Sequence, residues 1–229
     1  MKYLLCGLLV FLGAAAFSAA EGITDESRKS KEAVDMSYAF GMVVAGDLAG
    51  TGLEFNYSAF TRGLRAVMER EKTRYTMDEA MDIIQTAFAA AQEERGEQNR
   101  IEGAAFLAEN GRRSGIITTP SGLQYENIAE GTGEIPGIHD TVLVNYRGTT
   151  IDGIVFDTTF DDNPVELPMN NVIPGWLEGL RMMKEGGRAK LYIPSNLAYG
   201  PNGAGGAIGP NAVLVFDVEL ITVIKPGQE

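Results

Sequence analysis

The apolar positions in the first part of the chain recur every three or four residues, the spacing that places them along one face of a helix. This pattern predicts a helix over residues 33–48, which Gly50 is placed to end. A second helix is predicted to begin after Asn56, because an asparagine side chain accepts hydrogen bonds from the free N–H groups of a first turn. Both segments are rich in small residues, so neither buries much apolar surface alone.

A third predicted helix is the longest and the most polar. It begins with a capping box at residues 76–79 (TMDE), in which the threonine hydroxyl and the glutamate carboxylate satisfy each other's free N–H groups. Residues 92–110 are mostly Glu, Gln, Asn, Arg and Ala, and Gly111 suits the end of the helix. A helix this polar either bridges solvent between domains or pairs with another chain. We interpret residues 21–110 as an all-helical module that ends in a long stalk helix.

The predicted helices of this module are too few to bury a large core by themselves. Association with a second copy would supply the missing burial, so we expect a homodimer formed through residues 24–110. The alternative is that these helices fold back onto the second half of their own chain.

Beyond Gly115 the apolar positions alternate with polar ones, as they do in half-buried strands. The dipeptide Asp152-Gly153 separates two such runs and is a hairpin turn signal. A single short helix that starts at Pro174 interrupts the strands. Residues 111–229 are therefore predicted to form an α+β domain, an antiparallel sheet with one helix across it. The expected strands are 123–128, 142–146, 154–156, 165–167, 188–193 and 213–220.

Trp176 lies on the first turn of that short helix and is the only tryptophan in the chain. A large ring in this position has two interpretations. Such a side chain is most often part of the core beneath the helix. It could instead stand at the rim of the core and line a pocket. The helical pattern alone leaves both interpretations open.

Residues 1–20 have the composition of a secretory signal peptide. Lys2 precedes a short apolar run, and residues 18–20 supply the small side chains of a cleavage site, so cleavage is predicted after Ala20. We expect an exported protein, with the periplasm as the first expectation and the cell surface or secretion as alternatives. Cys6 is the only cysteine and lies in the removed segment, so the mature chain is expected to have no disulfide.

The charge balance and the rarity of histidine exclude several kinds of chemistry. There are 31 acidic and 19 basic residues, and the formal charge of -12 repels phosphate backbones, so no nucleic acid is expected as a partner. His139 is the only histidine, which rules out a two-histidine zinc site within one chain, and we find no supported pair of a nucleophile and a base. The acidic residues at 157–162 lack a calcium-loop pattern. We expect no metal and no cofactor.

The glycine-rich segment 199–210 has the composition of a phosphate-binding loop but not its spacing. Gly203 and Gly205 fit the first two positions of a dinucleotide fingerprint, whereas Ile208 occupies the third. Pro210 follows where a helix would have to open to bind the phosphates. We therefore exclude a nucleotide site.

One reaction needs no nucleophile, base or cofactor. Rotation about an X–Pro bond breaks no covalent bond, and its barrier of about 20 kcal/mol arises from amide resonance. An apolar pocket that holds the proline ring and removes the carbonyl from water would favour the twisted amide over the planar one.

Five motifs resemble, in order and spacing, those of the FKBP-type peptidyl-prolyl isomerase domain: VNYRG at 144–148, GIVFD at 153–157, VIPGW at 172–176, LAYG at 197–200 and LVFDVEL at 214–220. The resemblance covers about residues 115–225 and implies a twisted antiparallel sheet wrapped around one short helix. Residues 24–110 resemble, more loosely, the helical N-terminal module of the exported bacterial macrophage-infectivity-potentiator-like members. In that subgroup the module dimerises and holds two isomerase domains apart.

The resemblance also implies a role for each residue of a proline pocket. The catalytic residues would be Asp157, beside the twisting amide, and Tyr199, whose hydroxyl would bind the peptide or a macrolide inhibitor. Trp176 would be the pocket floor, the N–H of Ile173 would bind the chain, and Ile208 would come from the overhanging glycine-rich loop. The apolar walls would be Tyr146, Phe156, Val172, Ile173 and Phe216.

The chain departs from the family pattern at the rim of this pocket. Asp161 and Asp162 occupy the place where some members have a basic residue that pairs with the pocket aspartate. Val165 stands at an aromatic wall position, and Ala204 and Ala207 stand where bulkier residues often occur. These departures affect the expected macrolide affinity and the choice of residue before proline, and they leave the pocket floor intact.

We therefore predict a peptidyl-prolyl cis-trans isomerase that assists the folding of exported proteins and acts on proline-containing polypeptide clients. The alternative hypothesis is a non-catalytic dimeric chaperone or surface-interaction protein. Such a protein would hold its clients in the cleft between the two domains.

Overall fold

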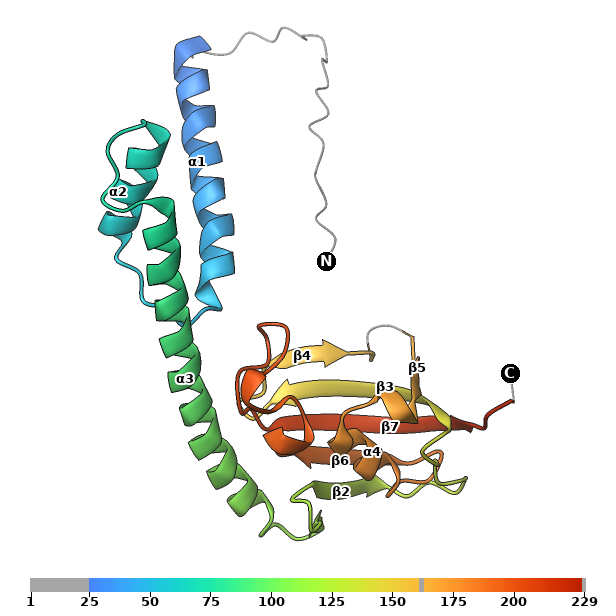
Figure 1. The fold of residues 1–229 in the computed structure, drawn as a ribbon. Helices are drawn as coiled ribbons and strands as arrows, with labels where there is room; N and C mark the ends of the chain where they lie inside the picture. The colour runs from blue at the N-terminus through green and yellow to red at the C-terminus, as the bar shows by residue number, and fades with distance from the viewer. Residues whose placement is uncertain (1–24, 161–162, 228–229) are drawn as a thin grey trace, which may run out of the picture. The chain divides into compact units, whose positions relative to one another are not determined.

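The computed structural model describes residues 25–160 and 163–227 (Figure 1). The predicted signal peptide, residues 1–20, lies outside the described residues, as do the rim residues Asp161 and Asp162. In the part that is described, no helix is both long enough and apolar enough to cross a membrane.

The chain divides into two compact units, and the first ends at Gly46. This first unit contains most of helix α1 (Asp25–Ala49). The helix predicted over residues 33–48 is confirmed, but it begins earlier, at Asp25. The added residues are polar, so the apolar pattern could not show them, and most of them favour helix.

Helices α2 (Tyr57–Met68) and α3 (Met77–Asn110) begin at the caps that the sequence predicts. The side chain of Asn56 accepts a 2.9 Å hydrogen bond from the backbone N–H of the third residue of α2. Thr76 and Glu79 form both hydrogen bonds of the capping box. Local side-chain signals therefore position the start of each helix correctly.

The C-terminal half of α3 packs against the sheet domain of its own chain. Gly103 is buried, and a Cβ atom there would lie 2.6 Å from Cγ2 of Val213. Asn110 is also buried, and its Nδ2 donates a 2.8 Å hydrogen bond to Oε1 of Gln124. A glycine costs a helix interior about 0.5–1 kcal/mol relative to alanine, and here it permits this close approach. This part of α3 therefore contacts the sheet domain of its own chain.

The second half of the chain forms one antiparallel sheet, whose strands are β1 (Ile116–Thr118), β2 (Gln124–Ala129), β3 (Thr141–Thr150), β4 (Val155–Thr158), β5 (Val165–Pro168), β6 (Arg188–Ile193) and β7 (Leu214–Ile224). The strand order is β1-β2-β6-β7-β3-β4, and β5 also pairs with β3. Strand β1 was not predicted, because three residues are too few to show an alternating pattern.

Helix α4 (Pro174–Leu180) packs on the sheet at close range (Figure 1). Its two glycines, Gly175 and Gly179, make this possible. A Cβ atom on Gly175 would lie 2.3 Å from Cγ2 of Ile193, and one on Gly179 would lie 2.6 Å from Cδ1 of Leu191. The predicted α+β fold, an antiparallel sheet around one short helix after an all-helical segment, is confirmed.

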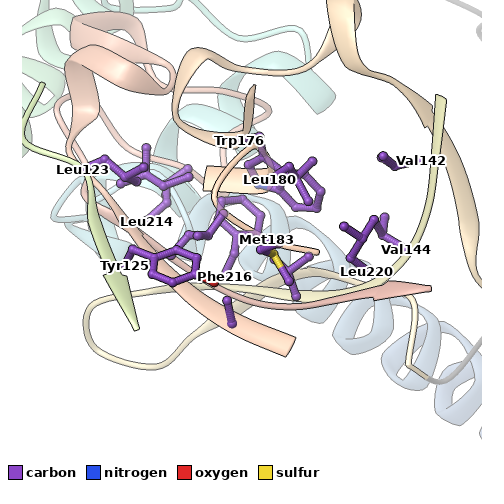
Figure 2. Packing of buried hydrophobic residues seen from close by; sticks show 14 of the residues in the cluster. Leu123, Tyr125, Val142, Val144, Trp176, Leu180, Met183, Leu214, Phe216 and Leu220 are labelled. Carbon is purple, nitrogen blue, oxygen red and sulfur yellow. The ribbon is translucent and has the colours of Figure 1, made fainter. Parts of the chain in front are cut away.

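The hydrophobic core lies between α4 and the sheet. In Figure 2, side chains of α4 face those of β7, with Tyr125 of β2 and Val144 of β3 beside them. Its largest fully buried members are Leu123, Met169, Leu180, Met183, Leu191, Ile193, Leu214 and Leu220.

Candidate functional site

Four aromatic side chains from three strands and helix α4 meet at one end of the core. The ring of Trp176 lies 5.1 Å from that of Tyr146 and 5.2 Å from that of Phe216, and the ring planes are close to perpendicular in both pairs. Phe156 contacts Phe216 in the same way at 5.6 Å. Edge-to-face pairs contribute about 0.5–1.5 kcal/mol each beyond the area they bury. The rings therefore hold one another in fixed orientations.

The four rings of this aromatic cluster differ in burial. Trp176 and Phe216 are buried, whereas Tyr146 and Phe156 are half-buried. Gly148 on β3 lets the rings meet, because a Cβ atom there would lie 2.6 Å from the Phe156 ring. Trp176 is thus a core residue, and its ring contacts the half-buried ring of Tyr146.

Tyr146 joins the aromatic cluster to the carboxylate of Asp157. Its hydroxyl donates a 2.5 Å hydrogen bond to Oδ2 of Asp157, which lies on the exposed face of β4. Burial raises the pKa of Tyr146, and the hydrogen bond to Asp157 raises it further. The hydroxyl therefore stays protonated at neutral pH and acts as a donor rather than as a base.

Thr159 fixes the backbone of Tyr146 and is a site residue that the sequence did not predict. It is buried, its Oγ1 accepts a 2.9 Å hydrogen bond from the N–H of Tyr146, and its own N–H donates to the Tyr146 carbonyl at 2.9 Å. A single threonine after a strand carries no distinguishing sequence signal, so only the fold reveals this contact.

Val172 and Ile173 precede α4 and pack, half-buried, against the core cluster. The carbonyl of Ile173 accepts the first hydrogen bonds of the helix, from the N–H groups of Trp176 at 3.0 Å and Leu177 at 3.1 Å. Across residues 25–160 and 163–227, no group of the protein accepts a hydrogen bond from the N–H of Ile173. That donor is therefore available to a bound chain.

The glycine-rich loop folds into a small hairpin that carries Ile208. Ala204 and Ile208 exchange two backbone hydrogen bonds of 2.9 and 3.0 Å. The turn between them contains Gly205 and Gly206, whose φ angles of 60° and 74° favour glycine. Ile208 is buried in the same cluster as Trp176. The glycines therefore build a turn.

Tyr199 begins the segment that leads into this loop. Its side chain is 41% exposed, and its hydroxyl has no hydrogen-bond partner within the described part of the chain. It lies close enough to Tyr146 to contribute to the raised pKa of that residue. Tyr199 is therefore an exposed residue near Tyr146.

The structure thus brings the nine predicted site residues into one region. Trp176, Ile208 and Phe216 belong to the buried cluster, and Tyr146, Phe156, Val172 and Ile173 pack against it. Of the rim residues, Val165 and Ala204 also pack against the cluster, and Ala207 is exposed.

Comparison with known proteins assigns both halves of the chain to family models. The model described as FKBP-type peptidyl-prolyl cis-trans isomerase matches residues 133–221. The model described as the domain amino terminal to FKBP-type peptidyl-prolyl isomerase matches residues 33–126.

Individual relatives extend over most of the chain. The chain is 41% identical to the probable FKBP-type peptidyl-prolyl cis-trans isomerase FkpA of Neisseria meningitidis, over 83% of this chain and 74% of that protein. It is 36% identical to the outer membrane protein MIP of Legionella longbeachae, over 92% of this chain and 94% of that protein. The crystal structure of FkpA from Escherichia coli matches with a TM-score of 0.68 and 30% identity, over 88% of this chain and 98% of that chain.

Proposed function

The chain belongs to the family of FKBP-type peptidyl-prolyl cis-trans isomerases and is an isomerase of this type, and we propose that its active site is the aromatic cluster around Trp176. The observation that carries this proposal is the meeting of the Trp176, Tyr146 and Phe216 rings beside a hydrogen-bonded aspartate. A proline ring on the face of Trp176 would replace water with apolar and aromatic contacts.

The proposed mechanism stabilises the twisted amide rather than any covalent intermediate. The planar amide owes its barrier to resonance, and transfer of the X–Pro carbonyl out of water favours the twisted form, in which resonance is lost. Interactions that strengthen only in that form lower the barrier, and each 1.4 kcal/mol gives about a tenfold rate increase. Asp157 would face the twisting amide, while the N–H of Ile173 and the hydroxyl of Tyr199 would bind the chain on either side.

An isomerisation assay with a proline-containing peptide tests this proposal. We expect the mature chain to accelerate cis-trans exchange, Trp176→Leu to remove most of the activity, and Tyr199→Phe to reduce it. Arg62→Ala, an exposed change in α2, is the matched control and should have no effect. A macrolide that binds the pocket should compete with the peptide. A wild-type chain that gives only the uncatalysed rate would refute the proposal.

Trp176 also provides a direct measurement of binding, because it is the only tryptophan. Its ring contacts Tyr146 and Phe216, so a proline peptide that covers it should change its fluorescence. An unchanged spectrum at peptide concentrations that saturate activity would show that the active site lies elsewhere.

We propose further that the protein is exported and works as a homodimer on folding clients. Support for export comes from the composition of residues 1–20 and from the similarity to the outer membrane protein MIP. Support for the dimer comes from the exposed apolar side chains of α1, which a partner would cover. They include Val34, Phe40, Met42 and Val43.

The same exposed apolar side chains favour a second candidate function, the holding of unfolded clients by the helical module. A measurement of client aggregation in the presence of the Trp176→Leu variant distinguishes the chaperone activity from the isomerase activity. Retained suppression with lost isomerisation would support an independent chaperone function. Loss of both together would assign all client binding to the proline pocket.

A further inference from the structure

The glycine-rich loop that carries Ile208 is fastened to helix α3 at its base. Nδ2 of Asn99 donates a 2.7 Å hydrogen bond to the carbonyl of Pro210. In the opposite direction, Nδ2 of Asn211 donates a 3.1 Å hydrogen bond to the carbonyl of Gly96. The helix and the loop therefore exchange two side-chain to backbone bonds within one turn of α3.

The backbones of Gly96 and Asn211 are adapted to this contact. A Cβ atom on Gly96 would lie 3.1 Å from Cβ of Pro210, so a larger residue would push the loop away. Asn211 has a φ of 55°, a conformation that asparagine tolerates better than most residues. Its N–H also donates a 2.8 Å hydrogen bond to the carbonyl of Gly200, which closes the loop at its base.

The tip of the loop consists largely of glycine, and only Ala204 and Ile208 pack it against the core cluster. Gly203, Gly205 and Gly206 all have positive φ angles, and glycine loses the most conformational entropy when it is ordered. A cavity of about 370 Å³ lies between this loop and the α3 residues Gln92 and Arg95. The position of the loop therefore depends on the packing of Ile208 and on the anchored base at Pro210, two residues further along the chain.

We propose that Asn99 is a positioning residue for the isomerase site: by holding Pro210 it keeps Ile208 over the proline pocket. Helix α3 is then a support of the active site as well as a part of the helical module. This inference rests on the proposed function, because it assumes that Ile208 contacts the bound chain. Such a contact affects binding more than the twisting step, so its loss should raise KM more than it lowers kcat.

A double-mutant cycle on the mature full-length chain tests the inference. We expect Asn99→Ala to raise KM for a proline peptide about fivefold, the worth of one hydrogen bond, with kcat within about twofold of wild type. If Asn99 acts through Ile208, its loss should have no further effect once Ile208 has been replaced. The variant that combines Asn99→Ala with Ile208→Ala should therefore have the same KM as Ile208→Ala alone. Gln98→Ala is the matched control, because that side chain contacts Glu102 of its own helix and should leave KM unchanged.

Several outcomes would overturn the inference. The first two are an unchanged KM in Asn99→Ala and an unchanged KM in Ile208→Ala. The third is a double variant whose increase in KM equals the product of the increases in the two single variants. An inactive wild-type chain would instead overturn the proposed function. If Asn99→Ala fails to fold, Asn211→Gly replaces it, because glycine accepts the positive φ and only the reciprocal bond is lost. A wild-type KM for that variant also overturns the inference.

Discussion

The hydroxyl of Tyr146 holds the carboxylate of Asp157 at a distance of 2.5 Å. Within the described residues, this hydroxyl is the only side-chain donor that binds Asp157, which lies on the exposed side of β4. Asp157 is therefore oriented by one bond from the wall of the aromatic cluster. We propose that its second oxygen interacts with a bound amide.

The first prediction concerns Asp157 itself. Asp157→Ala should lower kcat/KM by about tenfold, equivalent to about 1.4 kcal/mol of transition-state stabilisation. The melting temperature should change little, because the side chain is exposed and bonds only to the Tyr146 hydroxyl. Kinetics and thermal unfolding of the same sample provide the measurement. Asp152→Ala, in the turn after β3, is the control, and an equal loss of activity there would contradict a specific role for Asp157.

The second prediction is the pH dependence that follows from Tyr146. Its pKa is raised by burial and by Asp157, so the protonated form is favoured in the folded state. The stabilisation is fully present below the unfolded-state pKa of about 10 and is lost only as the pH rises through the higher folded-state value. Ionisation of Tyr146 should therefore cause no change in kcat/KM between about pH 6 and 9.

Absorbance titration of the tyrosines checks this assignment. Tyr146→Phe should remove one ionisation at the alkaline end of the curve, and it should lower kcat/KM at neutral pH because Asp157 loses its donor. Loss of an ionisation near the ordinary tyrosine pKa instead would show that Tyr146 is not perturbed.

The third prediction concerns the close packing of α4. Gly175→Ala should destabilise the sheet domain by about 1–3 kcal/mol, because the added methyl group would overlap the side chain of Ile193. Urea unfolding followed by Trp176 fluorescence measures this loss. Gly63→Ala in α2 is the control, since a Cβ atom there meets nothing within 4 Å. That variant should leave the fluorescence transition unchanged, and an equal shift in both variants would contradict the packing argument.

The sequence predicts best those features that depend on neighbouring residues. The Asn56 cap and the Thr76–Glu79 capping box lie within one turn of the helix starts that they specify, and both are present. The alternating strands of the sheet are likewise visible in the residue pattern. Trp176 was ambiguous because helical spacing does not show which side chains a ring contacts.

The features that the sequence did not reveal depend on distant contacts. Asn99 and Pro210 are 111 positions apart, and the polar composition of α3 suggested a helix that bridges solvent between domains or pairs with another chain. The polar pattern did not indicate that Gly96 and Gly103 form a contact face of α3, although both are buried against the sheet domain. Thr159 acts by binding the backbone of Tyr146. Other small residues with a hydroxyl group could form the same bonds, so the residue type alone did not indicate this role.

The fourth prediction tests the proposed homodimer. The side chain of Phe40 is 67% exposed and that of Val43 is 65% exposed, although both are apolar. A partner chain over this face of α1 would bury them, so Phe40→Glu should convert the dimer to a monomer in a sizing measurement with light scattering. Ser37→Glu, also on α1, is the control for added charge. A monomeric wild-type chain would contradict the proposed dimer.

The last prediction concerns the end of strand β7, which is tied to the loop before β3. Asp140 is buried, and its Oδ2 accepts hydrogen bonds from Nζ of Lys225 at 2.9 Å and from the N–H of Gly137 at 2.7 Å. Lys225 also pairs with Glu134 at 3.0 Å. The bond from Lys225, followed by that from Gly137, lowers the pKa of Asp140 in the folded state.

A lowered folded-state pKa makes the contribution of Asp140 to stability largest at neutral pH. That contribution is full above the unfolded-state pKa of about 3.9 and is lost as the pH falls through the lower folded-state value. Lys225→Met should therefore destabilise the chain at pH 7 and have a smaller effect near pH 3, as measured by urea unfolding at each pH. Lys184→Met removes an exposed pair with Glu130 and should change stability little at either pH, because solvent screens such pairs. An effect of Lys225→Met that stays constant from pH 7 to 3 would show that it acts through packing and not through the charge of Asp140.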